Sequence, residues 1–112
     1  KNKGANVVMV LNMTELSIAQ WSNAQLDAAR KLCTDGTLHD CALPTIVPTD
    51  SSVRVRVLAW DTADTVMTMK PEAVILQGEP VFVNAFLELY GTRIQCYSPC
   101  YADGKFVQFR RF

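Results

Sequence analysis

The residues best placed for chemistry form a short turn, Gln77-Gly78-Glu79-Pro80, between an apolar segment and a predicted helix. Gly78 permits close approach of a ligand to the backbone, and the helix that follows directs free N–H groups and the positive end of its dipole toward the turn. This arrangement suits a phosphate, but the Glu79 carboxylate would compete with an anion and could instead bind a ribose hydroxyl or a base amino group. The alternative is a plain strand-to-helix turn with a favourable acidic residue at the helix start.

A second group of polar residues follows the first apolar segment of the chain. Asn12 and Thr14 offer neutral hydrogen-bonding groups for phosphate or ribose oxygens, or they tie the loop to the sheet. Trp21 is either a stacking surface for a base or an anchor in the core. His39 is the single histidine, so a two-histidine acid–base pair cannot form within one subunit, and a structural or surface role is expected.

Other familiar site patterns are missing from the sequence. The glycines allow neither G-x-G-x-x-G nor G-x-x-x-x-G-K-[ST], and there is no G-x-S-x-G. The cysteines are irregularly spaced and form no C-x-x-C, which argues against a zinc site and predicts the reduced thiols of a cytoplasmic protein. They are Cys33, Cys41, Cys96 and Cys100. The sequence therefore predicts neither a metal nor a cofactor.

Composition limits the class of protein further. The 112 residues are expected to form a single domain, 1–112, and 49% of them are hydrophobic, which is too many for a disordered chain. Eleven Lys and Arg residues balance eleven Asp and Glu residues, which argues against a polybasic protein that binds double-stranded DNA. No apolar run approaches the roughly 20 residues of a membrane span, so no membrane association is expected.

The elements that must position these residues follow from the apolar periodicity. Strands are predicted at 6–11, 38–43, 72–76, 93–97 and 105–112, and helices at 22–35, from a cap within 50–52 to about Met69, and at 81–89. The alternation at 53–57 also fits a strand, but the length of the segment favours a helix. The apolar line predicted for that helix is Val53, Val57, Trp60, Asp64 and Met67, of which four are apolar.

The predicted order β-α-β-α-β-α-β-β is typical of a Rossmann-like open α/β sheet, mostly parallel, with helices on both faces. The residues 98–104 are expected to form a turn, with Asp103-Gly104 as a hairpin signal, so the last strand should be an antiparallel edge strand. Its basic residues, such as Arg110 and Arg111, would discourage edge-to-edge aggregation. Ligands of such sheets bind beyond the carboxyl ends of the strands, which selects the loops 12–21, 77–80 and 98–103.

Five segments taken together resemble the small stand-alone CRISPR-associated Rossmann-like proteins, a CARF-like group of the ring-nuclease type. They are Asn12-Met-Thr14, Gln20-Trp21-Ser22, the loop from Pro44 to Pro48, Ala73-Val-Ile-Leu-Gln-Gly-Glu-Pro80 with Phe82-Val-Asn-Ala-Phe86, and Gly104-Lys-Phe-Val-Gln-Phe-Arg-Arg-Phe112. The resemblance covers nearly the whole chain in order. The Q-G-E turn and the terminal F-V-Q-F-R strand are its most specific parts.

The resemblance implies a cyclic oligoadenylate-binding protein of type III CRISPR defence. Several members of the group are ring nucleases, which linearise the cyclic messenger without a metal by attack of a ribose 2′-hydroxyl on the adjacent phosphate. A homodimer with the ring across its two-fold axis is expected by the same resemblance. The alternative is a non-catalytic nucleotide-sensing or protein-interaction module with the same fold.

The resemblance also assigns site residues by position. Asn12 and Thr14 would hold the backbone of the ring, and Ser98 is the third catalytic candidate. The expected ligand-binding residues are Met13, Trp21, Gln77, Gly78, Glu79, Asn84 and Tyr97. Members of the group tend to carry a basic residue soon after the fourth strand, whereas this chain reads Ser98-Pro-Cys-Tyr101, so binding is better supported than cleavage. Ring size and base identity stay open.

Overall fold

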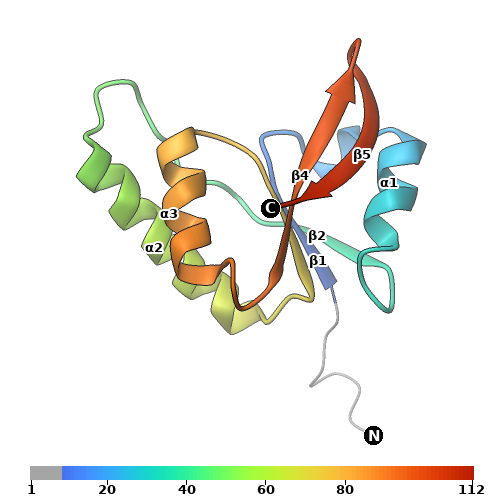
Figure 1. The fold of residues 1–112 in the computed structure, drawn as a ribbon, viewed down its shortest axis with the longest axis horizontal. Coiled ribbons are helices and arrows are strands. Elements are labelled where there is room, and N and C mark those ends of the chain that lie inside the picture. The colour runs from blue at the N-terminus through green and yellow to red at the C-terminus, as the bar shows by residue number, and fades with distance from the viewer. Residues whose placement is uncertain (1–8) are drawn as a thin grey trace, which may run out of the picture.

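Five strands form one sheet in the order β2-β1-β3-β4-β5 (Figure 1). The computed structural model describes residues 9–112. The strands are β1 (Met9–Met13), β2 (Thr37–Asp40), β3 (Ala73–Leu76), β4 (Gln95–Ala102) and β5 (Lys105–Arg111). The first four strands are parallel to one another, and β5 pairs antiparallel with β4 at the edge. The predicted mostly parallel, Rossmann-like α/β sheet is confirmed.

Three helices cover the two faces of this sheet. Helix α1 (Asn23–Arg30) lies on one face, and α2 (Ser52–Met69) and α3 (Pro80–Tyr90) lie side by side on the other. A short 3₁₀ turn, η2 (Ile18–Gln20), precedes α1. Each helix begins at a side chain that accepts a hydrogen bond from the backbone N–H three residues on: Ser22 for α1, Ser51 for α2 and Glu79 for α3.

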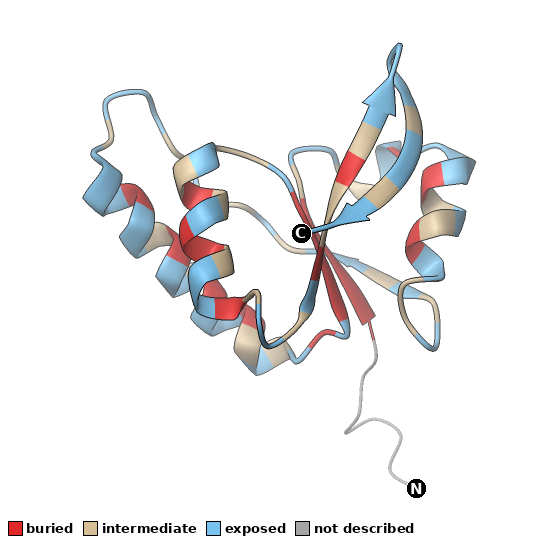
Figure 2. Cartoon of the chain, in the orientation of Figure 1, coloured by how far each residue is buried: buried red, intermediate tan, exposed pale blue. Residues whose placement is uncertain are grey.

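The core lies on both faces of β1 and β3, whose residues are all buried (Figure 2). A continuous apolar run is expected for a strand that helices cover on both sides. Leu11, Met13 and Leu76 pack toward the side of α2 and α3, where Phe86 is fully buried. The smaller cluster on the α1 side consists of Val10, Trp21, Ala29, Ala73 and Ile75.

Several predicted boundaries are wrong. Helix α1 ends at Arg30 rather than at the predicted stop of Asp35-Gly36, and Gly36 instead has a positive φ of 75° in the turn before β2. The first strand runs to Met13, two residues past the predicted end, and its predicted residues 6–8 lie outside the described residues. The second strand ends at Asp40, so the predicted strand residues 41–43 belong to the loop that follows.

The fourth strand shows the largest difference from the prediction. The predicted turn at 98–104 is wrong, because Ser98 to Ala102 continue β4 and pair with β5. Pro99 is tolerated there because the pairing of β4 with β3 has ended at Tyr97, which leaves a partner on one side only. The turn is Asp103-Gly104 alone, with φ of 52° and 75°, as a two-residue hairpin requires.

The face of α2 that packs inward also differs from the prediction. The structure buries the line Val55, Ala59, Ala63 and Val66 against the sheet and α3. The predicted line is exposed at Val53, Val57 and Trp60. Alanines on the inner line allow α2 to approach its neighbours closely, since the distance between packed helices depends on the side chains at the contact.

Candidate functional site

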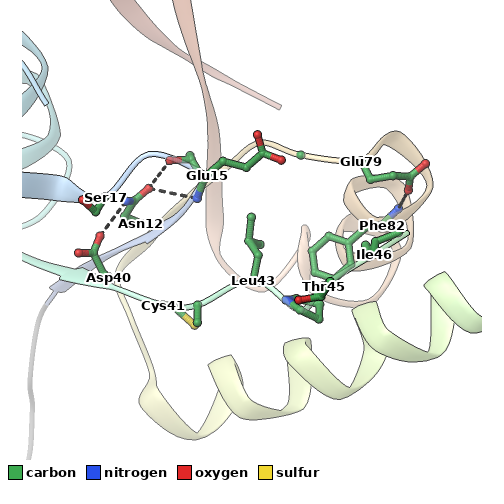
Figure 3. Close-up of a pocket in the computed structure, with 14 residues that line it drawn as sticks. Asn12, Glu15, Ser17, Asp40, Cys41, Leu43, Thr45, Ile46, Glu79 and Phe82 are labelled. Atoms are coloured by element: carbon green, nitrogen blue, oxygen red, sulfur yellow. Dashed lines mark hydrogen bonds between the residues drawn. The ribbon is translucent and has the colours of Figure 1, made fainter. Parts of the chain in front are cut away.

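A cavity of about 680 Å³ opens beyond the carboxyl ends of β1, β2 and β3 (Figure 3). From β1 the chain passes to β2 on one side of the sheet, while β3 lies on the other side of β1. This is the topological switch point at which open α/β sheets bind ligands. Its lining comes from the end of β1 and the loop after it (Asn12, Thr14, Glu15, Ser17), from residues 40–46, and from the turn and first residues of α3 (Gly78, Glu79, Phe82).

Asn12 holds the β1 side of this pocket together. Its amide nitrogen donates to the Leu16 carbonyl and to Asp40 Oδ1, both at 2.8 Å, and its oxygen accepts from the backbone N–H and the hydroxyl of Thr14. Asp40 Oδ1 also accepts the N–H of Ile18. Asn12 is 2% exposed, so its side chain is used within the protein. In the structure, Asn12 therefore ties the loop after β1 to the sheet, which is one of the two roles predicted for it.

The pocket lining combines acidic and apolar side chains. Its carboxylates are Glu15, Asp40 and Glu79, and its larger apolar side chains are Leu43, Pro44, Ile46 and Phe82. Figure 3 shows Leu43 pointing into the cavity between Asn12 and Phe82. Within the part of the chain that the structure describes, no Lys or Arg lines the pocket. The lining is therefore suited to groups that donate hydrogen bonds, and it disfavours a bare anion.

These carboxylates do not form a metal site. Among residues 9–112, no three His, Cys, Asp or Glu side chains gather as the ligands of a metal ion would. Cys41 also lines the cavity, where burial raises the pKa of its thiol. A neutral thiol is a weak nucleophile, so Cys41 contributes contact area and not charge.

The turn at Gly78 is a capped helix start. Glu79 accepts the N–H of Phe82 at 2.8 Å through its own carboxylate, and Pro80, at the first helical position, has no N–H to offer. The carboxylate therefore occupies the place that a phosphate would take at the N-terminus of α3. The sequence allowed either a ligand-binding turn or a strand-to-helix turn with an acidic residue at the helix start. The structure shows Glu79 acting as the cap of the helix.

The structure brings four of the predicted site residues to the pocket: Asn12, Thr14, Gly78 and Glu79. Met13 points instead into the core on the side of α2 and α3, and the side chain of Gln77 is exposed outside the pocket. Trp21 is buried in the α1-side cluster, where its indole N–H donates to the Leu16 carbonyl at 3.1 Å.

The other predicted residues also lie apart from the pocket. Asn84 lines a separate, smaller groove between α2 and α3, together with Arg56 and Glu88. Tyr97 and Ser98 lie inside β4, opposite residues of β5, because the strand is longer than predicted. The fourth strand thus does not complete the pocket.

Sequence reasoning missed the segment 40–46, which forms the wall opposite α3's first turn. The signal that could have found it was present, because this segment follows the carboxyl end of β2, next to β1 in the sheet. Pro44 and Pro48 further restrict this loop, since each fixes its own φ and restrains the residue before it.

Comparisons with known proteins add no family to this description. No protein-family model, no curated protein and no solved structure gives a significant match to the chain. The class of protein, an open Rossmann-like α/β sheet with a pocket at its switch point, rests on strand order, strand direction and the lining residues. Between residues 9 and 112, no helix has the length and apolarity needed to cross a membrane.

Replacing Gly78 by alanine should leave the fold intact. A Cβ at this position would meet only Leu43 Cδ1 at 3.9 Å, an ordinary contact, and the backbone there is not left-handed. We expect the free energy of unfolding to stay unchanged or rise by about 0.4–1 kcal/mol, because alanine restricts the unfolded chain. Urea denaturation measures this effect.

Gly91→Ala is the matched control for this substitution. Its Cβ would lie 2.7 Å from the Leu87 carbonyl oxygen, a backbone atom that cannot move away easily, so this variant should be destabilised. An equal loss of stability in both variants would show that the Gly78 turn needs glycine after all. A stable Gly78→Ala variant then provides a folded protein with a smaller pocket.

Proposed function

We propose that this protein binds a cyclic oligoadenylate, with one adenosine unit in the pocket at the switch point. The observation that carries the proposal is the combination of apolar side chains with carboxylates in the lining of a cavity of about 680 Å³, which is within the usual range for ligand sites. The resemblance of the turn at 77–80 and of the last strand to CARF-like proteins supports the choice of this ligand class.

The two kinds of lining side chain suit the two parts of a nucleoside. An adenine ring would lie against Leu43, Ile46 and Phe82, and its exocyclic amino group and the ribose hydroxyls would donate to Glu15 or to the free oxygens of Asp40 and Glu79. The phosphates would lie at the mouth of the pocket, because three carboxylates inside repel them. In the homodimer that the resemblance implies, a second copy would bind the other side of the ring.

Cleavage is a separate step with its own requirements. In it the ribose 2′-oxygen bonds to phosphorus, the P–O5′ bond breaks, the 2′-hydroxyl loses its proton and the 5′-oxygen gains one, which leaves a cyclic phosphate. Of the three catalytic candidates, Thr14 lines the pocket, the Asn12 amide is bonded within the protein, and Ser98 lies in β4. The described lining offers carboxylates as bases but no cation for the transition state. This charge pattern favours the alternative of a non-catalytic sensor.

Thermal melting with cyclic tri-, tetra- and hexa-adenylate, without metal, tests binding and cleavage together. A ring at 100 times its dissociation constant should stabilise the native state by about 2.7 kcal/mol and raise the melting temperature. Chromatography of the same samples detects linear products with cyclic-phosphate ends. Cyclic oligouridylates are the control. The proposal is wrong if no cyclic oligoadenylate raises the melting temperature, or if the cyclic oligouridylates raise it by the same amount.

Protection of a single thiol locates the ligand within the protein. Cys41 lines the pocket, whereas Cys33 packs with the cluster on the α1 side of the sheet, and burial raises the pKa of both thiols. We expect a bound ring to slow alkylation of Cys41 at mildly alkaline pH and to leave Cys33 unchanged, as measured by peptide mass spectrometry. Binding without any protection of Cys41 would place the ligand elsewhere.

A further inference from the structure

Helix α2 presents an apolar stripe to solvent on the side away from the sheet. Val53, Val57 and Trp60 are 67%, 43% and 42% exposed. Their spacing of four and three residues, which the exposed Asp64 continues, is that of the a and d positions of a coiled-coil seam, and the stripe ends before Met67, which packs against the core. None of the three lines the pocket.

We propose that two copies of this chain associate through this stripe, with their α2 helices antiparallel about a two-fold axis. If the two-fold axis passes between Val57 and Trp60, each Val57 packs against Trp60 of the second copy. A parallel arrangement would instead place Asp64 against Asp64 in the seam, where like charges repel. The inference does not rest on the proposed function, since no residue of the stripe touches the pocket.

The charges beside the stripe fit the same arrangement. Arg54 lies on one flank near the start of the helix, and Asp61 lies on the same flank one heptad later. In an antiparallel pair, equivalent flanking positions face each other, so Arg54 of each copy lies beside Asp61 of the other. The two-fold axis makes this contact twice, and the surface is therefore complementary to itself in charge as well as in apolar character.

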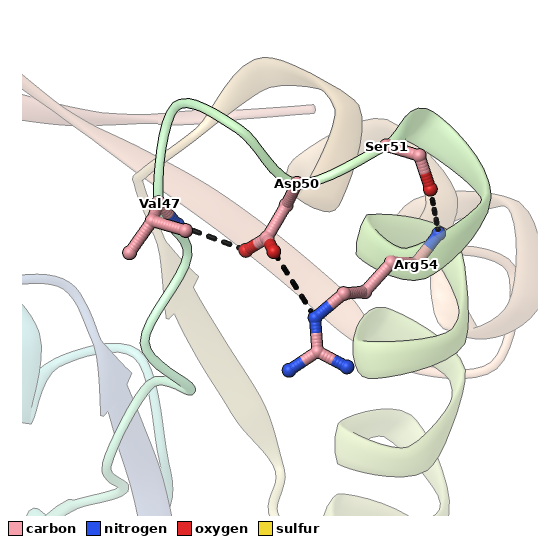
Figure 4. Close-up of polar contacts among 4 residues, drawn as sticks. All are labelled: Val47, Asp50, Ser51 and Arg54. Carbon is pink, nitrogen blue, oxygen red and sulfur yellow. Dashed lines mark hydrogen bonds and ion pairs between the residues drawn. The ribbon is translucent and has the colours of Figure 1, made fainter.

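Arg54 is restrained by an ion pair within its own chain (Figure 4). Its Nε donates to Asp50 Oδ1 at 3.1 Å, and Asp50 in turn accepts the N–H of Val47. Figure 4 shows the two terminal nitrogens of the guanidinium extending beyond this ion pair. The Arg54 side chain is 61% exposed, so these nitrogens can reach a second molecule. A side chain that is oriented beforehand loses less freedom on binding.

The small size of the stripe sets the strength of the association. Stable interfaces bury about 800 Å² on each partner, which three half-exposed side chains do not reach. We therefore expect a reversible dimer with a dissociation constant on the order of 100 μM, in the range of weak, small interfaces.

Sedimentation equilibrium of the full chain, free of nucleotide and at up to about 1 mM, tests the proposal. The wild type should approach a dimer as its concentration rises, and Trp60→Glu should stay monomeric. Leu89→Glu is the matched control, because Leu89 is 38% exposed on α3, outside the stripe, and its substitution should leave the dimer unchanged. Melting curves of the variants confirm that each is folded.

A charge exchange tests the geometry itself. Arg54→Asp and Asp61→Arg should each weaken self-association by about tenfold, since each sets like charges together twice. An equal mixture of the two variants should restore association, because every facing pair is then opposite in charge. The inference is overturned if the wild type stays monomeric or if the Trp60→Glu variant still forms a dimer. It is also overturned if mixing the Arg54→Asp and Asp61→Arg variants does not restore association. A dimer that forms only with a cyclic adenylate and survives Trp60→Glu also overturns it, and that result would support the proposed function alone.

Discussion

Replacing Asn12 by alanine should lower the free energy of unfolding by about 2–4 kcal/mol, the largest effect that we expect from a residue of the pocket. The buried amide makes four hydrogen bonds, to Leu16, Asp40 and Thr14, and each contributes about 0.5–1.5 kcal/mol. Urea unfolding measures the loss. Thr14→Ala removes a hydroxyl that donates to Asn12 and makes two exposed, longer contacts with the backbone of Leu16, so its effect should be about 1 kcal/mol.

Asn12→Ala should also loosen the pocket, although the Asn12 amide bonds within the protein and is not left free for a ligand. Asn12 links the loop after β1 to the end of β2 through Asp40, which also accepts the N–H of Ile18. In Asn12→Ala, hydrogen exchange at the amides of Thr14 and Ile18 should become faster, while exchange in β3 should change only with global stability. Unchanged exchange at both amides, with stability within about 0.5 kcal/mol of the wild type, would contradict the bracing role of Asn12.

Trp21→Ala should lower the free energy of unfolding by about 3–5 kcal/mol, which is the usual cost of removing a large aromatic side chain from a core. Trp21 is 6% exposed, and its ring centroid lies 6.2 Å from that of Phe109 in β5. The cluster on the α1 side is the smaller of the two, so few neighbours can fill the cavity. Chemical denaturation at several temperatures measures the effect.

Trp21→Phe separates the packing role of this residue from a role in ligand binding. Phenylalanine keeps an aromatic ring against Phe109 and loses the hydrogen bond to the Leu16 carbonyl, so we expect a loss of about 1 kcal/mol. Because Trp21 lies outside the pocket lining, this variant should keep the affinity of the wild type for the cyclic adenylate that we propose as the ligand. A stable variant with lost affinity would instead support a stacking role for Trp21.

The features that sequence predicted correctly are those that neighbouring residues determine. The β1 and β3 segments are continuous apolar runs, and such runs are buried wherever helices cover both faces of a sheet. Asp103-Gly104 needs only its own two positive φ angles to make the hairpin. Ser51 is one of the three candidates that the sequence offered for the cap of α2. Fold class therefore follows from local pattern.

The features that sequence predicted wrongly depend on contacts between distant segments. Ser98-Pro99-Cys100 has the composition of a turn, but pairing with β5 makes it a strand. The choice between the two apolar lines of α2 is made by α3 and the sheet, which accept the small side chains of Ala59 and Ala63. The wall at 40–46 forms because β2 lies beside β1, and this neighbour relation appears only in the assembled sheet. The residues that gather around the pocket could not be predicted where their placement depends on strand order.

The Glu79 cap has a consequence for competition inside a cell. A pocket that binds adenine, as we propose for this one, would be exposed to ATP, whose triphosphate would normally gain from a free helix N-terminus. Here that position holds a carboxylate of the protein itself, and Glu15 and Asp40 add further negative charge to the lining. A ligand with one phosphate charge per nucleotide suffers less repulsion at this site than a compact triphosphate does. The acidic lining would then keep the pocket vacant in the presence of ATP until a rarer, less densely charged nucleotide arrives.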